Sequence, residues 1–170
     1  MKAVLVVILL SLARAVSADS NSAQAFEQLK SIVGQWQGVT ERGRSLRIDY
    51  ATSARGSVLV ETWQPGASGE TISVVHLDGS RLMATHYCGQ GNQPRLVMGS
   101  SDGKRFVFEY LDASNLADPD ASHLHRLEFV RQPDGSLERI ETYLSGAHSE
   151  ISKVRLTRLE RIGDEDIHGP

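Results

Sequence analysis

The chain has 170 residues with one cysteine, and its 18 basic and 21 acidic residues give a net charge of −3. This length suits one domain, and the acidic balance argues against nucleic acid, whose binding requires a basic footprint. A single cysteine leaves no internal disulfide, so packing alone must hold the fold together.

The first 18 residues have the pattern of a secretory signal peptide. Lys2 gives a basic start, residues 3–13 are apolar except for Ser11, and residues 16–18 supply small side chains before a cut after Ala18. The apolar run is shorter than the about 20 residues that a membrane-spanning helix needs. We therefore expect an exported protein, periplasmic or secreted, with no transmembrane segment after cleavage. An uncleaved amphipathic anchor is the alternative.

The expected mature chain is one domain over residues 19–160, followed by a disordered tail over residues 161–170. Loss of Lys2 and Arg14 leaves 16 basic against 21 acidic residues, a net charge of −5. This charge gives no support for binding to anionic membranes. The tail is expected because residues 161–170 are mostly charged or small and show no periodicity.

A short amphipathic helix is expected at the start of the mature chain. Apolar residues recur there at helical spacing, namely Ala25, Phe26, Leu29, Ile32 and Val33. Gly34 follows as a C-terminal stop. We expect this helix to close one end of the domain with Phe26 and Leu29 pointing inward.

Ten strand-like runs follow, separated by turn signals at roughly 8–12 residues, which is typical of all-β folds. Asp78-Gly79 between two alternating runs is a hairpin signal. We therefore predict an up-and-down antiparallel barrel of about ten strands with one short N-terminal helix. The expected strands are 35–40, 44–51, 56–64, 70–77, 80–88, 93–101, 104–111, 123–131, 136–144 and 150–159.

Gly34-Gln35-Trp36, at the start of the first expected strand, is similar to the G-x-W signature of lipocalins and related calycin barrels. In those proteins the tryptophan plugs the closed end of the barrel. The resemblance implies that role for Trp36. Ten expected strands are closer to the number in fatty-acid-binding proteins than to the eight of lipocalins, but the helical pair of the fatty-acid binders is missing.

Four further segments resemble those of a lipocalin-like family of secreted bacterial domains. The resemblance covers most of the mature chain and implies a calycin-type barrel, with no activity attached. The segments are Thr85-His86-Tyr87-Cys88, Asn92-Gln93-Pro94, Ser114-Asn115-Leu116 and His123-Leu124-His125.

His123 and His125 are two apart on an expected strand and would share a face with Leu127 and Phe129, which favours an inward position for both imidazoles. Inward imidazoles need partners. A metal ion would satisfy both, and so would hydrogen bonds to carboxylates or water. Candidates for a third metal ligand are His86, Glu61, Glu109 and Glu141.

His86 and Cys88 also share a face, which raises thiol chemistry as an alternative to a polar cluster beside a buried thiol. Residues 89–94 form either an ordinary turn or a loop at the barrel mouth that contacts ligand together with Tyr87. Asn92 belongs to that loop.

Phe106, Phe108 and Leu127 are expected to line a cavity, because a ten-stranded barrel is wide enough to leave one. The sequence thus predicts that the protein binds or carries a small, largely apolar molecule, with His86, His123 and His125 as its polar wall. Two alternatives remain open: a metal- or haem-dependent enzyme or binder that uses the same histidines, and a structural envelope protein with a filled barrel. The cofactor, if any, is not specified.

Overall fold

The computed structural model describes residues 21–64 and 66–160. The expected signal peptide over residues 1–18 and the expected tail over residues 161–170 lie outside these ranges. In the described part of the chain, no helix combines the length and the apolar character needed to cross a membrane.

The all-β prediction is confirmed, since ten strands follow one N-terminal helix. That helix is α-helical over residues 21–29 and ends as a 3-10 turn, η1 (Lys30–Ile32). A second 3-10 turn, η2 (Ala54–Gly56), joins the second strand to the third. The strands are β1 (Gly34–Val39), β2 (Ser45–Ser53), β3 (Val58–Trp63), β4 (Thr71–Asp78), β5 (Arg81–Tyr87), β6 (Gln93–Ser101), β7 (Arg105–Ser114), β8 (His123–Arg131), β9 (Leu137–Ser145) and β10 (His148–Arg158).

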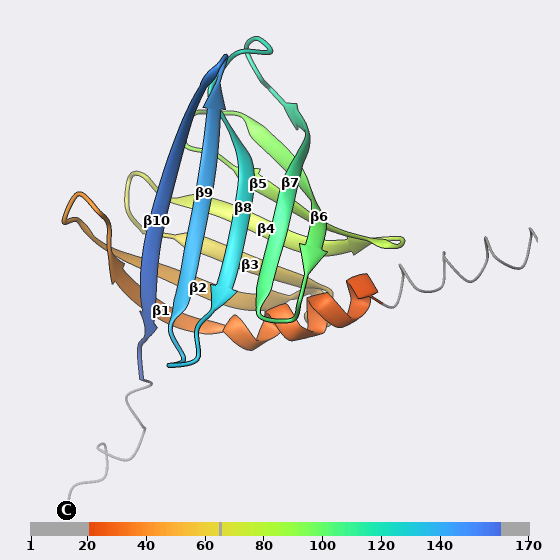
Figure 1. Cartoon of the computed structure of the whole chain (residues 1–170), viewed down its shortest axis with the longest axis vertical. Helices are drawn as coiled ribbons and strands as arrows, with labels where there is room; N and C mark the ends of the chain where they lie inside the picture. Colours follow the sequence, from red (N-terminus) through yellow and green to blue (C-terminus); the bar gives the residue numbers. More distant parts are fainter. Residues whose placement is uncertain (1–20, 65, 161–170) are drawn as a thin grey trace, which may run out of the picture.

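Each strand pairs antiparallel with the next, and β1 pairs with β10 to close the barrel (Figure 1). In such a meander, alternate connections fall at opposite ends. The connections β2–β3, β4–β5, β6–β7 and β8–β9 lie at the end near the helix. The connections β1–β2, β3–β4, β5–β6, β7–β8 and β9–β10 lie at the other end, which we call the mouth.

Side chains alternate between the barrel interior and solvent, as the pleat requires. On β2, Leu46, Ile48 and Tyr50 are buried, whereas Arg47 is exposed. The interior near the helix is a continuous apolar core. It contains edge-to-face aromatic pairs such as Phe108 and Phe129, whose ring centroids are 6.2 Å apart.

The helix crosses one end of the barrel (Figure 1), with Phe26 and Leu29 buried in the core as expected. Trp36, on β1, is buried beside it, and its indole Nε1 donates a hydrogen bond to the carbonyl of Ile32 at 2.7 Å. Gly34, with φ of +141°, lets the chain turn from helix to strand where a side chain would collide with Arg158. Trp36 and Gly34 therefore both lie at the helix end of the barrel, where β1 begins.

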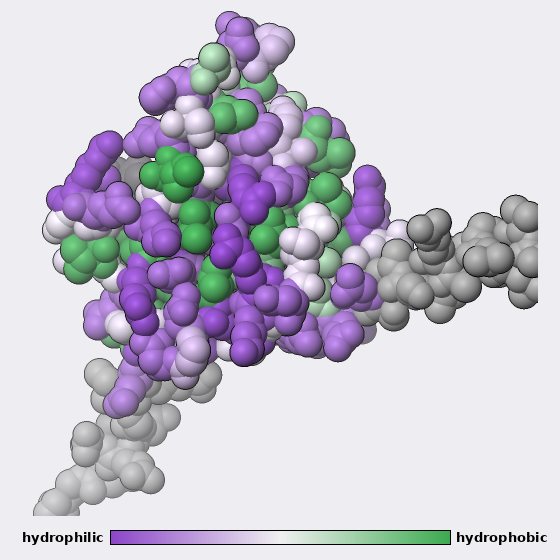
Figure 2. Space-filling view, in the orientation of Figure 1, coloured by the Kyte–Doolittle hydropathy of each residue, from purple (hydrophilic) through white to green (hydrophobic). Residues whose placement is uncertain are grey.

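The outer wall over β6 to β10 is mostly hydrophilic, with hydrophobic residues scattered among polar ones (Figure 2). Ion pairs cover part of it, including Arg126 with Glu109 and Glu128, and Arg105 with Glu128. Scattered apolar side chains are normal on a protein surface.

Candidate functional site

A row of polar side chains crosses four neighbouring strands inside the barrel. Tyr50 on β2 pairs in register with Glu61 on β3, Glu61 with Ser73 on β4, and Ser73 with His86 on β5. Their side chains are linked in the same order. The Tyr50 hydroxyl donates to Glu61 at 2.9 Å, Ser73 Oγ donates to Glu61 at 2.9 Å, and Ser73 Oγ lies 3.0 Å from His86 Nδ1. All four residues are buried.

Strand β9 meets this row from the opposite wall. Arg139 donates two hydrogen bonds of 2.7 Å to the two carboxylate oxygens of Glu61, so an ion pair crosses the barrel. Its Nη1 lies 2.8 Å from Glu141 Oε1, close enough for an ion pair but without hydrogen-bond alignment. The guanidinium carbon is 4.8 Å from the ring centre of Trp63, and the Tyr143 hydroxyl is 3.4 Å from His86 Nε2.

The environment fixes the charge states in this network. Burial raises the pKa of Glu61, but the charge and hydrogen bonds of Arg139 outweigh burial and hold that pKa below its usual value. The pKa of Arg139 is raised, because Glu141 and Glu61 together outweigh its desolvation. Burial lowers the pKa of His86, and it raises the pKa of both Tyr50 and Tyr143. At neutral pH the network therefore has a charged Arg139, an ionised Glu61 and a neutral His86.

Above this network the mouth contains a cavity of about 390 Å³. Trp63, Glu141 and Tyr143 lie at its floor, directly next to Arg139 and His86. Its walls come from the connections at this end and from the start of β10. The other lining residues are Thr40, Glu41, Arg42, Arg44, Gly69, Thr71, Gln90, Ser122, Glu150, Ile151 and Ser152. Hydroxyl, amide, carboxylate and guanidinium groups thus surround one aromatic floor.

The structure places His123 and His125 differently from the sequence expectation. A β-bulge on β8 lets Leu124 pair with Tyr143 and Arg126 with Thr142, which leaves His125 without a register partner. The extra residue reverses the alternation. Leu124, which is fully buried, therefore joins Leu127 and Phe129 on the inner face, and the expected shared face of these residues with the two histidines is wrong.

Both histidines instead contact Tyr110, where the pairing of β7 with β8 ends: His125 stacks on its ring, and His123 packs against it at a tilt. His123 Nδ1 is 2.8 Å from the carbonyl of Ala121, and His123 Nε2 is 3.4 Å from His125 Nδ1. Burial, followed by the charge of His123, lowers the pKa of His125. His86 belongs to the separate network described above.

The three histidines therefore do not form one wall. Among residues 21–64 and 66–160, no group of three or more His, Cys, Asp or Glu side chains could hold a metal ion. This result speaks against the three-ligand metal site that the sequence raised for His86, His123 and His125.

The expected cavity lining of Phe106, Phe108 and Leu127 is also wrong. All three side chains have 0% exposed surface and pack in the core. They pack against other side chains of the same core cluster, including Tyr50 and Leu96. The barrel is filled at this level, so a ligand tail has no space there.

The remaining residues expected at the site have mixed positions. Tyr87 is 50% exposed and alternates with the inward His86, so it lies on the outer wall. Asn92 is buried and donates to the carbonyl of Ser122 at 2.8 Å, which ties two mouth connections together. Cys88, which the sequence suggested would be buried, is half-buried, and its Sγ accepts a hydrogen bond from the Gln90 amide at 3.5 Å.

Sequence reasoning missed Arg139, Ser73 and Tyr143, although a signal was present. Leu137, Arg139, Glu141 and Tyr143 alternate along β9, so a buried leucine shares its face with charged groups. Leu59, Glu61 and Trp63 show the same pattern on β3. A charge of each sign on an inward face indicates a buried ion pair, because a lone buried charge is too costly.

Comparison with protein-family models gave no match, and no curated protein matches the chain significantly.

Proposed function

We propose that this protein is an exported small-molecule-binding barrel that holds its ligand in the mouth, over Trp63, Glu141 and Tyr143. The main support is the cavity of about 390 Å³ whose aromatic and polar floor is fixed by the buried network beneath it. Ligand sites usually measure about 300–1,000 Å³ and combine an apolar surface with a few well-placed polar groups. Export rests on the signal-peptide pattern of residues 1–18.

The lining favours a ligand that is more polar than the one expected from the sequence. The ring of Trp63 offers a flat surface, while Tyr143 and Glu141 offer hydrogen-bonding groups beside it. The filled core below excludes a long apolar tail from the barrel centre. The ligand class proposed here is a small molecule with one ring face and several hydrogen-bonding groups.

The floor is suited to binding because its groups are already held in place. Arg139 contacts Glu61, Glu141 and Trp63 together, and Tyr143 contacts His86. A ligand that enters the mouth therefore meets groups that need little further ordering. Such preorganisation reduces the entropy lost on binding.

The test begins with protein purified from its natural compartment without denaturation. Solvent extraction and mass spectrometry would identify a retained molecule, which is then titrated back into stripped protein by calorimetry. We expect Tyr143→Phe and Glu141→Gln to weaken binding roughly tenfold each, because each loses a hydrogen bond in a partly buried site. Thr157→Val, on the outer side of β10, is the control and should bind normally.

Two results would contradict the proposal. One is native protein that retains no small molecule and also gives no binding heat with aromatic amines, aromatic acids or monosaccharides. The other is a retained molecule whose affinity neither floor variant changes.

A further inference from the structure

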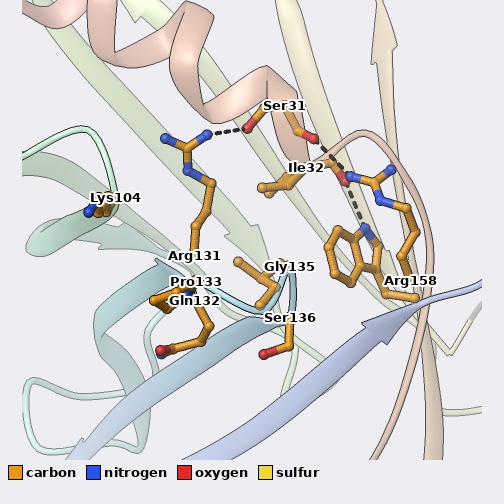
Figure 3. Close-up of a pocket in the computed structure, with 11 residues that line it drawn as sticks. Ser31, Ile32, Lys104, Arg131, Gln132, Pro133, Gly135, Ser136 and Arg158 are labelled. Atoms are coloured by element: carbon orange, nitrogen blue, oxygen red, sulfur yellow. Dashed lines mark hydrogen bonds between the residues drawn. The ribbon is translucent and has the colours of Figure 1, made fainter.

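A second cavity, of about 400 Å³, lies at the opposite end of the barrel, under the C-terminal end of the helix (Figure 3). The helix end, the β6–β7 turn, the β8–β9 turn and the end of β10 surround it. Its lining is Ser31, Ile32, Trp36, Lys104, Arg131, Gln132, Pro133, Gly135, Ser136, Leu137 and Arg158. This cavity is independent of the mouth and of the function proposed for it.

The lining contains three cations and no carboxylate: Lys104, Arg131 and Arg158. Ten of the fifteen lysines and arginines in the described ranges form ion pairs within 4.0 Å. Of the five that do not pair with a described carboxylate, three line this one cavity. The concentration of positive charge is notable in a chain whose net charge is negative.

Neutral groups hold both guanidinium groups in place. Arg131 donates to Ser31 Oγ and Arg158 donates to the carbonyl of Ser31, both at 2.8 Å (Figure 3). Arg131 also donates to the carbonyl of Gly103, and Arg158 to that of Val33. Arg158 also lies 4.4 Å from the ring centre of Trp36. These contacts position the two cations without neutralising them.

Hydrogen bonding to the open carbonyls at the helix C-terminus explains only part of this arrangement of cations. Arg158 satisfies carbonyls that the helix leaves open, a common role for a cation there. That role accounts neither for Lys104 nor for Arg131 Nε, which is buried and has no hydrogen-bond partner in the described structure. A donor left buried in this way is costly unless a bound group completes it.

The rest of the lining is apolar. Ile32, Trp36 and Leu137 are buried beneath the charged rim, and Pro133 lies beside them. We propose that this cavity binds a small organic anion, with its carboxylate among Lys104, Arg131 and Arg158 and its apolar part against Trp36 and Ile32. Bidentate guanidinium groups suit a carboxylate, and the volume suits a molecule of modest size.

The test uses octanoate as the probe and the two indole N–H signals of the protein as separate reporters. The chain has two tryptophans, Trp36 at this cavity and Trp63 at the mouth. We expect octanoate to shift the Trp36 signal in a ¹H–¹⁵N spectrum and to leave Trp63 in place. Acetate, octanol and inorganic phosphate test whether both the charge and the apolar part are needed.

Charge variants then test the cations. We expect Lys104→Gln to raise the Kd for octanoate about threefold and Arg131→Gln to raise it about tenfold, with weaker binding at higher salt. Within the described residues the Lys104 side chain has no hydrogen bond or ion pair, whereas Arg131 is bonded to Ser31, so the Lys104 variant should fold normally even if the Arg131 variant does not. Lys153→Gln makes the same charge change on the outer side of β10 and should bind like the unaltered protein.

Several results would overturn the proposal: no Trp36 shift with millimolar octanoate, equal affinity for octanol or for acetate, or affinities that neither charge variant changes. A shift of Trp63 alone would place the anion in the mouth and would also contradict it. Failure here leaves the mouth proposal untouched, because that proposal is judged by Tyr143 and Glu141.

Discussion

Glu61 and Arg139 are 2% and 1% exposed and share two hydrogen bonds of 2.7 Å across the barrel. A buried ion pair of this kind contributes little net stability compared with well-packed apolar residues, but loss of one partner leaves a buried charge unmatched. Tyr50 and Ser73 add two more hydrogen bonds to Glu61. The pair thus fixes the position of the site floor more than it stabilises the fold.

We predict that Glu61→Gln destabilises the protein by about 3–5 kcal/mol, because Arg139 keeps its charge in a buried site. The free energy of unfolding from urea titration measures this. The double variant Glu61→Leu with Arg139→Met should lose clearly less than the sum of Glu61→Leu and Arg139→Met made separately. Strictly additive losses would show that the two residues are not coupled in this way.

His86 should make stability pH-dependent below neutrality. Its pKa is lowered in the folded protein, mainly by burial, while Glu141 raises it, Arg139 lowers it and Glu61 raises it. The unfolded chain, with a histidine pKa of about 6.5, therefore takes up protons first, and stability falls as pH drops below about 6.5. The lowered pKa of Glu61 causes a separate loss only at lower pH, below about 4.5.

Urea titrations between pH 7.5 and 5 measure this effect. The unaltered protein should lose stability over that range, and His86→Gln should lose less. His148→Gln, an exposed position on β10, serves as the control and should follow the unaltered protein. Parallel curves for the unaltered protein and the His86 variant would contradict the account.

The N-terminal helix and β1 act together as the closed end of the barrel. Trp36 joins them by packing against the core and by its 2.7 Å hydrogen bond to Ile32. Phe26 and Leu29 are buried in the same core cluster as Trp36. Loss of the indole would open a cavity that the rigid strand ends close only partly.

We predict that Trp36→Ala costs about 3–5 kcal/mol in the free energy of unfolding. Ile151→Ala on β10, where the side chain is 65% exposed, is the matched control and should change stability little. A loss below about 1 kcal/mol for the Trp36 variant would mean that the ring is not an integral part of the core.

Strands could be predicted from the sequence because their signals are local. Alternation and turn residues placed β6 and β8 at the observed bounds and the other strands within about three residues of them. The bulge at His125 has no comparable local signal, and it reversed the face of both histidines. The contact between Glu61 and Arg139 joins positions 78 apart in the chain, which only the closed barrel brings together.

At the level of the whole molecule, the pattern of the first 18 residues predicts export. We predict that cleavage after Ala18 releases the mature protein, because residues 16–18 follow a short apolar run in the way that a signal-peptide site requires. Intact mass spectrometry of the exported protein checks this. A protein that retains Met1, or one that carries a lipid at its N-terminus, would contradict the prediction.

The barrel interior has two halves with different chemistry. The half toward the helix holds the apolar core, with the cavity of about 400 Å³ at its end, and the half toward the mouth holds the polar network and the cavity of about 390 Å³. Ligand binding in the mouth requires that the apolar core and the polar network both stay intact when a ligand is present. A ligand within the apolar core would have to separate Phe106, Phe108 and Leu127, which are fully buried.

A crystal structure of the protein with the molecule it retains from its natural compartment would decide between these locations. We predict ligand density over Trp63 and Tyr143, with both hydrogen bonds between Glu61 and Arg139 intact. Density among Phe106, Phe108 and Leu127, with the core opened around it, would contradict the account.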